Sequence, residues 1–381
     1  MGAGLAQAGK SHPAGYDARQ PRVPVHFDGT GPRSRCQVVG PDTASIGSVR
    51  VREPFTISTL DASGNQLRPS VDADSVDLTR TFPVTGPIDI EGVSEGDVVA
   101  IEILDPRLAP EAHCWTRPGL GLLGTDDYFV KQLETDAPTW RFAGRPASGV
   151  PISLDPHVGT VGLSPARTHA ARDLGRHGGN LDVRALGSGA TLWLVAQVDG
   201  GRLYLGDVHA GIGDGEVCGT GLEAAANVTV QVHRRTDWTP TLLTISTSSR
   251  RWVVGVGESV EQAIATIVSA MTSIISSALA ISVDEARLLV SQSLILRICA
   301  VGKRAGAGDG CRTGPTCMVM RSSSLSRRYG VAVRPSQRRT GICRTPRPAG
   351  AWRFGLSGAR SRNCTGPAQC CGSARGASRR R

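Results

Sequence analysis

The sequence predicts an α+β fold that is mostly β, with a short helical region near its end and a basic tail beyond it. Apolar and polar residues alternate with a period of two in segments spread over residues 1–250, and Gly, Pro, Asp and Asn lie between these segments. Two segments with helical signals follow, at about residues 259–280 and 283–299. Strands that come first and helices that come last are typical of α+β proteins, whereas α/β proteins alternate the two.

Three segments show the period-two pattern most clearly, with an apolar residue at every second position. They are residues 99–104, 192–198 and 228–233. Turn signals lie between such segments, for example DASGN at 61–65 and DGG at 199–201. The pattern predicts strands with one face turned toward a core.

The first helical segment has the length and composition of a membrane span, because residues 263–281 contain no charge. Hydroxyl residues recur there at three- and four-residue steps and form one stripe of a helix: Thr266, Ser269, Ser273 and Ser277. Apolar residues fall mostly on the other side, so we expect a packed helical hairpin and no membrane contact. Ser259 with Gln262, and Ser282 with Glu285, have the spacing of capping boxes at the two helix starts.

Charge divides the chain into an acidic body and a basic tail. Residues 1–300 hold 25 Lys and Arg against 32 Asp and Glu, whereas residues 301–381 hold 18 Lys and Arg and one acid. We expect a flexible segment at 1–24, a folded domain at 25–299 and a disordered tail at 300–381. The tail has two interpretations, a nucleic-acid-binding arm or the product of a shifted reading frame in a GC-rich gene. The abrupt change of composition favours the second.

The cysteines and the N-terminus indicate a reducing compartment. The four cysteines of the body are scattered and do not form a disulfide framework. The first residues, MGAGLAQAGKSHPAGYD, contain no apolar core of a secretory signal. We therefore expect a cytoplasmic protein.

The densest group of chemically active side chains lies in the Gly-rich segment 206–223, GDVHAGIGDGEVCGTGLE. Its acids and histidine are Asp207, His209, Asp214, Glu216 and Glu223. Carboxylates and an imidazole on one loop can bind a metal ion or act as acid and base. Cys218 is a candidate nucleophile in the same segment, but acidic neighbours suppress a thiolate, so we expect a structural thiol.

A second, weaker group lies at residues 177–184, HGGNLDVR. His177, Asn180 and Asp182 flank a Gly-Gly turn there, and Asn180 can hydrogen-bond an amide or an oxyanion. His157, in a third Gly-containing segment, is more typical of a loop histidine than of a ligand. GLGLLG at 119–124 matches a nucleotide-binding pattern in letters, but it follows Arg117-Pro118 where that pattern needs a strand, so we expect no nucleotide site.

Four segments resemble the acetamidase/formamidase family. They are TGPIDIEGVSEGDVVAIEILD (85–105), PHVGTVGLSPA (156–166), the long run GGNLDVR…GDVHAGIGDGEVCGTGLEAAANVTV (178–230) and SVDEARLLVSQSLILRI (282–298). The resemblance implies a cytoplasmic hydrolase that releases ammonia from short neutral amides such as formamide and acetamide. It also implies a β-rich fold with flanking helices, a homo-oligomer and a divalent metal such as zinc or calcium. The sequence departs from the family after residue 298, where the basic tail replaces the closing segment.

The resemblance also suggests roles for individual residues. Asp207, His209, Asp214 and Glu216 fall on the GD-x-H and GDGE positions and are the predicted metal ligands; of these, Asp207, His209 and Glu216 are the predicted catalytic residues. Asn180 and Asp182 fall on GGN-x-D and are predicted to bind the substrate. A metal-activated water is the first mechanism and a carboxylate–histidine base without metal is the second. The alternative function is a non-enzymatic binding protein whose tail contacts nucleic acid; for an amidase, such binding would be only a non-specific effect of the tail.

Overall fold

The structure is a computed structural model, and it describes residues 25–68, 73–122, 124–136, 139–142, 151–236, 238–301 and 316–322. All of these belong to the first of two compact units, Met1–Pro335, while the second, Ser336–Arg381, lies outside the described residues. The predicted flexible segment at 1–24 and most of the predicted tail also lie outside them, as does any nucleic-acid-binding role of that tail.

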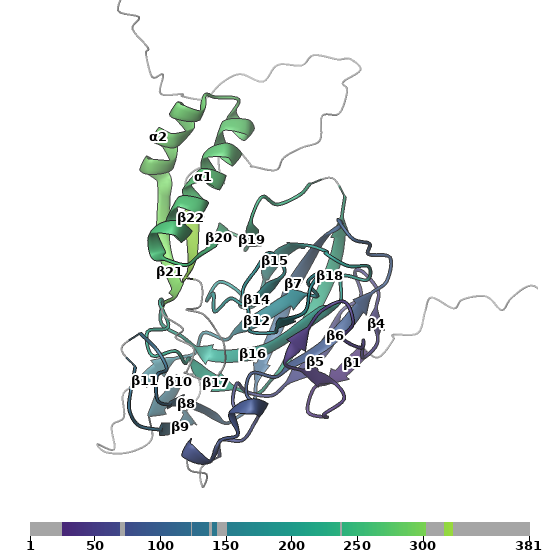
Figure 1. Ribbon diagram of the computed structural model, residues 1–381, viewed down its shortest axis with the longest axis vertical. Coiled ribbons are helices and arrows are strands. Elements are labelled where there is room, and N and C mark those ends of the chain that lie inside the picture. The colour runs from purple at the N-terminus through teal and green to yellow at the C-terminus, as the bar shows by residue number, and fades with distance from the viewer. Residues whose placement is uncertain are drawn as a thin grey trace, which may run out of the picture. The chain divides into compact units, whose positions relative to one another are not determined.

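The described residues form two large β-sheets (Figure 1). The first sheet has nine strands, and their order across it is β1 (Val25–Asp28), β5 (Phe55–Thr59), β18 (Ala226–Arg235), β7 (Val98–Leu108), β15 (Ala190–Val195), β19 (Leu243–Ser246), β20 (Arg251–Gly257), β22 (Thr316–Ser322) and β21 (Leu294–Ala300). The predicted strands at 99–104, 192–198 and 228–233 are β7, β15 and β18, so the period-two pattern is confirmed, although β15 ends at Val195.

The second sheet has eleven strands and carries the site. The order along its main path is β11 (Pro151–Ser153), β10 (Thr139–Phe142), β9 (Phe129–Asp136), β8 (Ala112–Thr116), β17 (Leu222–Ala224), β16 (Leu203–Gly211), β12 (His157–Leu163) and β14 (Gly178–Asn180). β6 (Val84–Ile90) also pairs with β16, and β2 (Arg35–Cys36) and β4 (Ser48–Val49) pair with β6. A separate small sheet joins β3 (Val38–Val39) to β13 (His169–Ala170), and two short 3-10 helices cover Ala73–Ser75 and Leu78–Arg80.

One apolar core joins the two sheets. Ile101 and Val230 of the first sheet and Val158, Leu205 and Val208 of the second are all fully buried in the same cluster. Burial of this apolar surface is the main force that holds the sheets together. The fold is therefore mostly β, as the sequence predicts.

Two helices follow β20. α1 (Val260–Leu279) and α2 (Val283–Ser293) share an apolar cluster that includes Ile267, Ile275 and Val290, which makes them a packed hairpin. Ser282 and Glu285 form the complete predicted capping box, whereas Ser259 caps α1 without the reciprocal bond, because Gln262 accepts from Glu258 N instead. α1 is long and apolar enough to cross a membrane by composition alone, which is weak support for a span because core helices share that composition.

The structure corrects the end of the second helix. The predicted helix at 283–299 ends at Ser293, and residues Leu294–Ala300 are strand β21. β22 lies between β20 and β21 and pairs with both, and the prediction that residues 300–381 are disordered stays a prediction. Alternating Leu and Ile over 294–298 suits a strand, and the pairing partner that decides between helix and strand comes from the tail.

Candidate metal centre

Three neighbouring strands of the second sheet place the central side chains of the site. His157 on β12 pairs directly with His209 on β16, and His209 pairs with Glu223 on β17. Residues that pair directly across strands project from the same face of a sheet. All three side chains are buried, with exposed fractions of 0%, 1% and 2%.

His209 is the centre of the group, because carboxylates lie at both of its ring nitrogens. Nε2 lies 3.5 Å from Asp207 Oδ1 and 3.4 Å from Glu223 Oε2, and Nδ1 lies 3.9 Å from Asp182 Oδ1. Two sets of three buried side chains have ligand atoms within 4.8 Å of one another, namely Asp207–His209–Glu223 and Asp182–His209–Glu216. Either set has the composition of a metal site, so the proton positions on His209 decide between them.

A chain of hydrogen bonds fixes those proton positions. His157 Nδ1 lies 2.7 Å from the carbonyl oxygen of Asp155 and must donate to it, so neutral His157 presents a lone pair at Nε2. His209 Nδ1 lies 3.3 Å from that Nε2 and donates its proton there. The Nε2 lone pair of neutral His209 therefore points toward Asp207 and Glu223. Hydrogen bonds of this kind fix the tautomer of many metal-binding histidines, and here they favour the set Asp207–His209–Glu223.

The two carboxylates also control the charge of His209. Burial by itself lowers the pKa of this imidazole, but Glu223 and Asp207 outweigh burial and raise it well above its ordinary value. Burial lowers the pKa of His157 to about 4, so that ring stays neutral. In the absence of an ion, Nε2 of His209 thus holds a proton between two carboxylates. A divalent cation would take the place of that proton.

Each carboxylate of the favoured set is held by one of its oxygens. Glu223 Oε1 accepts hydrogen bonds from Gly221 N at 2.9 Å and from the Thr220 hydroxyl at 3.1 Å, and Oε2 is left facing His209. Oε2 is buried and has no hydrogen-bond partner among the described residues. The Thr160 hydroxyl lies 3.1 Å from Asp207 Oδ2 and 3.1 Å from Asn180 Oδ1, so it orients Asp207.

The backbone around the group is strained. Asp182, Asp207 and Glu216 all have positive φ, at 48°, 54° and 41°. Left-handed conformations are unfavourable for residues with a Cβ, and such strain gathers at functional sites. Gly159 and Gly221 lie close to the His209 ring, where an added Cβ would come within 2.8 Å of ring carbons. These two glycines therefore allow the imidazole its position.

Comparison with known proteins identifies the family. Its sequence model, described as the Acetamidase/Formamidase family, matches residues 37–171 and 144–283, which include every residue of the group. The chain belongs to the acetamidase/formamidase family. It is 26% identical over 259 residues to a putative formamidase of Schizosaccharomyces pombe and 26% identical over 258 residues to a formamidase of Methylophilus methylotrophus. Each match covers 50% of this chain and 62% of the relative, so the chain spans less than two thirds of their length.

Solved structures share the fold of this family member. An acetamidase from Bacillus halodurans superposes with a TM-score of 0.72 at 24% identity, covering 81% of this chain and 100% of the other. A predicted acetamidase/formamidase from Thermoanaerobacter tengcongensis gives a TM-score of 0.72 at 23% identity, covering 81% and 98%. These likenesses support the mostly β fold.

The predicted site residues of this acetamidase/formamidase family member do not all lie together. Asp207, His209 and Glu216 meet in the buried group, and so does Asp182, which the sequence assigned to the substrate. Asp214 does not: it forms an ion pair with Arg297 at 3.2 Å and is 37% exposed. Asn180 lies beside the group, and its Oδ1 accepts from the Thr160 hydroxyl at 3.1 Å, the same hydroxyl that lies 3.1 Å from Asp207 Oδ2. The roles assigned to all of them stay predictions.

Two residues of the group are absent from the predicted site. Glu223 was visible in the sequence as the last acid of the Gly-rich segment, but only strand pairing shows that it faces His209. His157 was interpreted as a loop histidine, yet it lies in a fully buried strand and sets the tautomer of His209. The alternation of residues in β12 and β16 gives no hint of this pairing.

The loop that bears Glu216 is fixed by two other segments. Leu122 N, within GLGLLG, donates to Val217 O at 2.8 Å, so that segment supports the loop. On the other side, Gly215 N donates to Cys299 O at 3.1 Å and Val301 N donates to Gly215 O at 3.0 Å. Cys218 is exposed and belongs to neither metal set. The end of β21 therefore helps to position the site.

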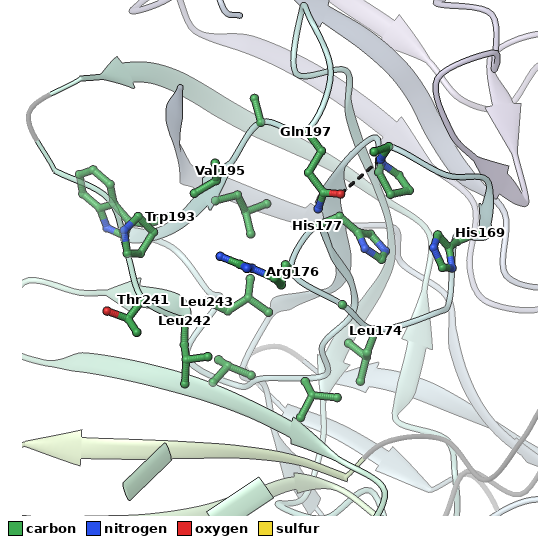
Figure 2. A pocket seen from close by; sticks show the side chains of 18 of the residues that line it. His169, Leu174, Arg176, His177, Trp193, Val195, Gln197, Thr241, Leu242 and Leu243 are labelled. Carbon is green, nitrogen blue, oxygen red and sulfur yellow. Dashed lines mark hydrogen bonds between the residues drawn. The ribbon is translucent and has the colours of Figure 1, made fainter. Parts of the chain in front are cut away.

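A large cavity of about 780 Å³ lies elsewhere and shares no residue with the group. Figure 2 shows Arg176, His177, Gln197, Trp193 and Leu243 among the residues that line it, and Gln197 Oε1 accepts from Ala166 N at 3.2 Å. Burial lowers the pKa of His177 to about 4. His177 of the second predicted cluster thus lines this cavity, while Asp182 of the same cluster joins the metal set.

Proposed function

We propose that this chain hydrolyses short linear amides such as formamide and acetamide and releases ammonia, with a divalent metal held by Asp207, His209 and Glu223. The observation that carries the proposal is the position of His209 Nε2, which lies 3.5 Å from Asp207 Oδ1 and 3.4 Å from Glu223 Oε2, while the Asp155–His157 hydrogen-bond chain occupies Nδ1. Membership of the acetamidase/formamidase family supports the substrate class.

The residues present suit a metal ion. Glu223 Oε2 is a buried carboxylate oxygen without a hydrogen-bond partner among the described residues, which is unfavourable unless a cation or proton compensates it. One imidazole nitrogen with two carboxylates is a set that suits zinc, whereas calcium takes six to eight oxygen ligands. We therefore favour zinc.

The residues around the proposed metal have separate roles in this mechanism. When bound, the metal supplies a Lewis acid that acidifies a water and polarises the amide carbonyl. Asp207, His209 and Glu223 hold it. Glu216 lies within 4.8 Å of His209 outside the favoured ligand set, and we assign it proton transfer from the water to the leaving amine. The Thr160 hydroxyl, 3.1 Å from Asp207 Oδ2, orients that carboxylate.

The second mechanism, a metal-free carboxylate–histidine base, is less favourable in this geometry. A general base must be unprotonated at the working pH, and the carboxylates at His209 raise its pKa well above the ordinary value. An imidazolium cannot accept the proton of water. With a metal ion in place of that proton, the activated water would not need His209 as a base, and Glu216, outside the ligand set, would accept its proton.

The test measures ammonia release from formamide and acetamide together with metal content, using the full chain. His209→Ala should lower kcat/KM by about a thousandfold or more and should lose bound metal, and Glu223→Gln should weaken metal binding. Asp214→Asn is the matched control, because Asp214 lies in the same loop region but pairs with Arg297. A His209→Ala protein that keeps both turnover and metal would refute the site.

We also propose a cytoplasmic location and a homo-oligomer. The free cysteines among the described residues, Cys36, Cys114, Cys218 and Cys299, support the first. The family resemblance supports the second, and the hydroxyl residues Ser269, Ser273 and Ser277 on the exposed side of α1 are a candidate contact surface. Light scattering of the purified chain tests the oligomer directly.

A further inference from the structure

The row of paired side chains continues beyond Glu223. His113 on β8 pairs directly with Glu223, and Gln132 on β9 pairs directly with His113. Direct cross-strand pairs project from one face, so Gln132, His113, Glu223, His209 and His157 form a single row across five strands. We call His113 and Gln132 the outer pair.

The outer pair is polar, and each side chain has a buried nitrogen without a hydrogen-bond partner among the described residues, although Gln132 as a whole is only half-buried. His113 is 3% exposed, and its Nε2 has no hydrogen-bond partner among the described residues. Gln132 Nε2 and Glu223 Oε2 are likewise buried and without such partners. Each unsatisfied buried group costs about 1–3 kcal/mol. Glu223 Oε2 faces His209, so His113 Nε2 and Gln132 Nε2, on adjacent paired strands, are the two atoms whose missing hydrogen bonds a polar ligand would supply.

The outer pair does not belong to the candidate metal sets. His113 is in neither group of side chains whose ligand atoms lie within 4.8 Å of one another, although Glu223 beside it is. The opposite face of the same strands is apolar, with Ala112, Leu133 and Ala224 in one cluster. The opposite face of these strands thus supplies the apolar packing, and the polar face does not contribute to it.

We propose that His113 and Gln132 form the subsite that hydrogen-bonds the carboxamide of the substrate beside Glu223. A primary amide carries one acceptor oxygen and two N–H donors. Gln132 Nε2 donates to the carbonyl oxygen, and His113 Nε2 accepts from the amide N–H. The subsite rests on the proposed function for the identity of its substrate, but its polar character comes from the structure alone.

The test uses His113→Leu and Gln132→Met, which remove the polar atoms and keep a similar volume. Each should raise KM for acetamide at least tenfold, with metal content unchanged and with a thermal midpoint equal to or above that of the wild type. A purely structural histidine would leave KM unchanged. Thr116→Val, on β8 but outside the row, is the matched control. A KM within twofold of the wild type in both variants would overturn the subsite.

A binding measurement separates this proposal from the proposed function. Saturation-transfer NMR with acetamide detects binding whether or not the chain turns the amide over. Acetamide that binds the wild type but neither variant, without ammonia release, would support the subsite and refute the hydrolase. Acetamide that binds all three proteins equally, or does not bind the wild type, would refute the subsite.

Discussion

Two cross-strand rows have the same burial and opposite chemistry. In the first sheet, Ile245, Leu192, Ile101 and Val232 pair directly across β19, β15, β7 and β18, and each is 0% exposed. In the second sheet, His157, His209, Glu223 and His113 pair across β12, β16, β17 and β8, with exposures from 0% to 3%. Burial alone therefore does not say what a row contributes.

The difference between the rows lies in what each needs to be stable. The apolar row gains free energy from burial without any specific partner. The polar row is favourable only where its groups are paired, protonated or bound to a cation, and its neighbours Asp182, Asp207 and Glu216 have strained backbones. We infer that the first row stabilises the fold, and that this stability offsets the free-energy cost of the polar row, which serves function.

The largest change in stability is expected when a side chain of the apolar row is shortened and leaves a cavity. Ile101→Ala removes buried methyl groups from the apolar cluster that the two sheets share, so it should lower the free energy of unfolding by about 4 kcal/mol. Denaturant unfolding measures the change, and ammonia release per folded molecule should stay within a few fold of the wild type. A selective loss of turnover with normal stability would show that the two rows are coupled.

Much of this fold follows from local sequence rules. Alternation locates β7 and β18, and the Ser282–Glu285 spacing locates the start of α2. The rules fail at Leu294–Ala300, because its conformation is decided by pairing with β22. A partner distant in sequence, rather than local propensity, determines such a strand.

The site was only partly predictable for the same reason. The density of acids around His209 identifies the segment, and it correctly singles out Asp207 and Glu216 as neighbours. Strand register adds His157, Glu223 and His113, which lie 52, 14 and 96 positions from His209. Asp214 lies outside the paired strands and forms an ion pair with Arg297, so it does not join the buried group.

The pH dependence of folding stability distinguishes the two rows, and its expected size is smaller than the effect of the cavity. His157 is held neutral, with its pKa lowered to about 4 from 6.5, mainly by burial and then by the charge of His209. The unfolded chain takes up this proton first, so folding stability falls as pH decreases from about 6.5 to about 4. The expected loss is about 3 kcal/mol from this residue. His177, with its pKa also lowered to about 4, should add a similar share.

Denaturant unfolding at several pH values tests this. His157→Gln should remove about half of the histidine-dependent change, because the carboxylates that also titrate in acid are common to both proteins. The apolar row offers no such dependence, so Ile101→Ala should shift the whole curve without changing its slope. Identical slopes for wild type and His157→Gln would contradict the buried neutral state of His157.

The smallest expected effect concerns Cys218, which is close to the polar row in sequence but separate from it in structure. Its side chain is exposed and belongs to neither metal set, whereas Glu216, two positions earlier, is buried in one of them. The other thiol near the row, Cys114, has its pKa raised to about 12, chiefly by burial and then by Glu223. A thiol that stays protonated is a weak nucleophile, so Cys114 does not replace Cys218 in that role.

Cys218→Ala should therefore keep kcat for acetamide within about twofold and change the free energy of unfolding by less than about 0.5 kcal/mol. Steady-state ammonia release and denaturant unfolding measure both, and a folded Cys218→Ala protein without turnover would mean that a covalent thiol step, outside the row, carries the reaction.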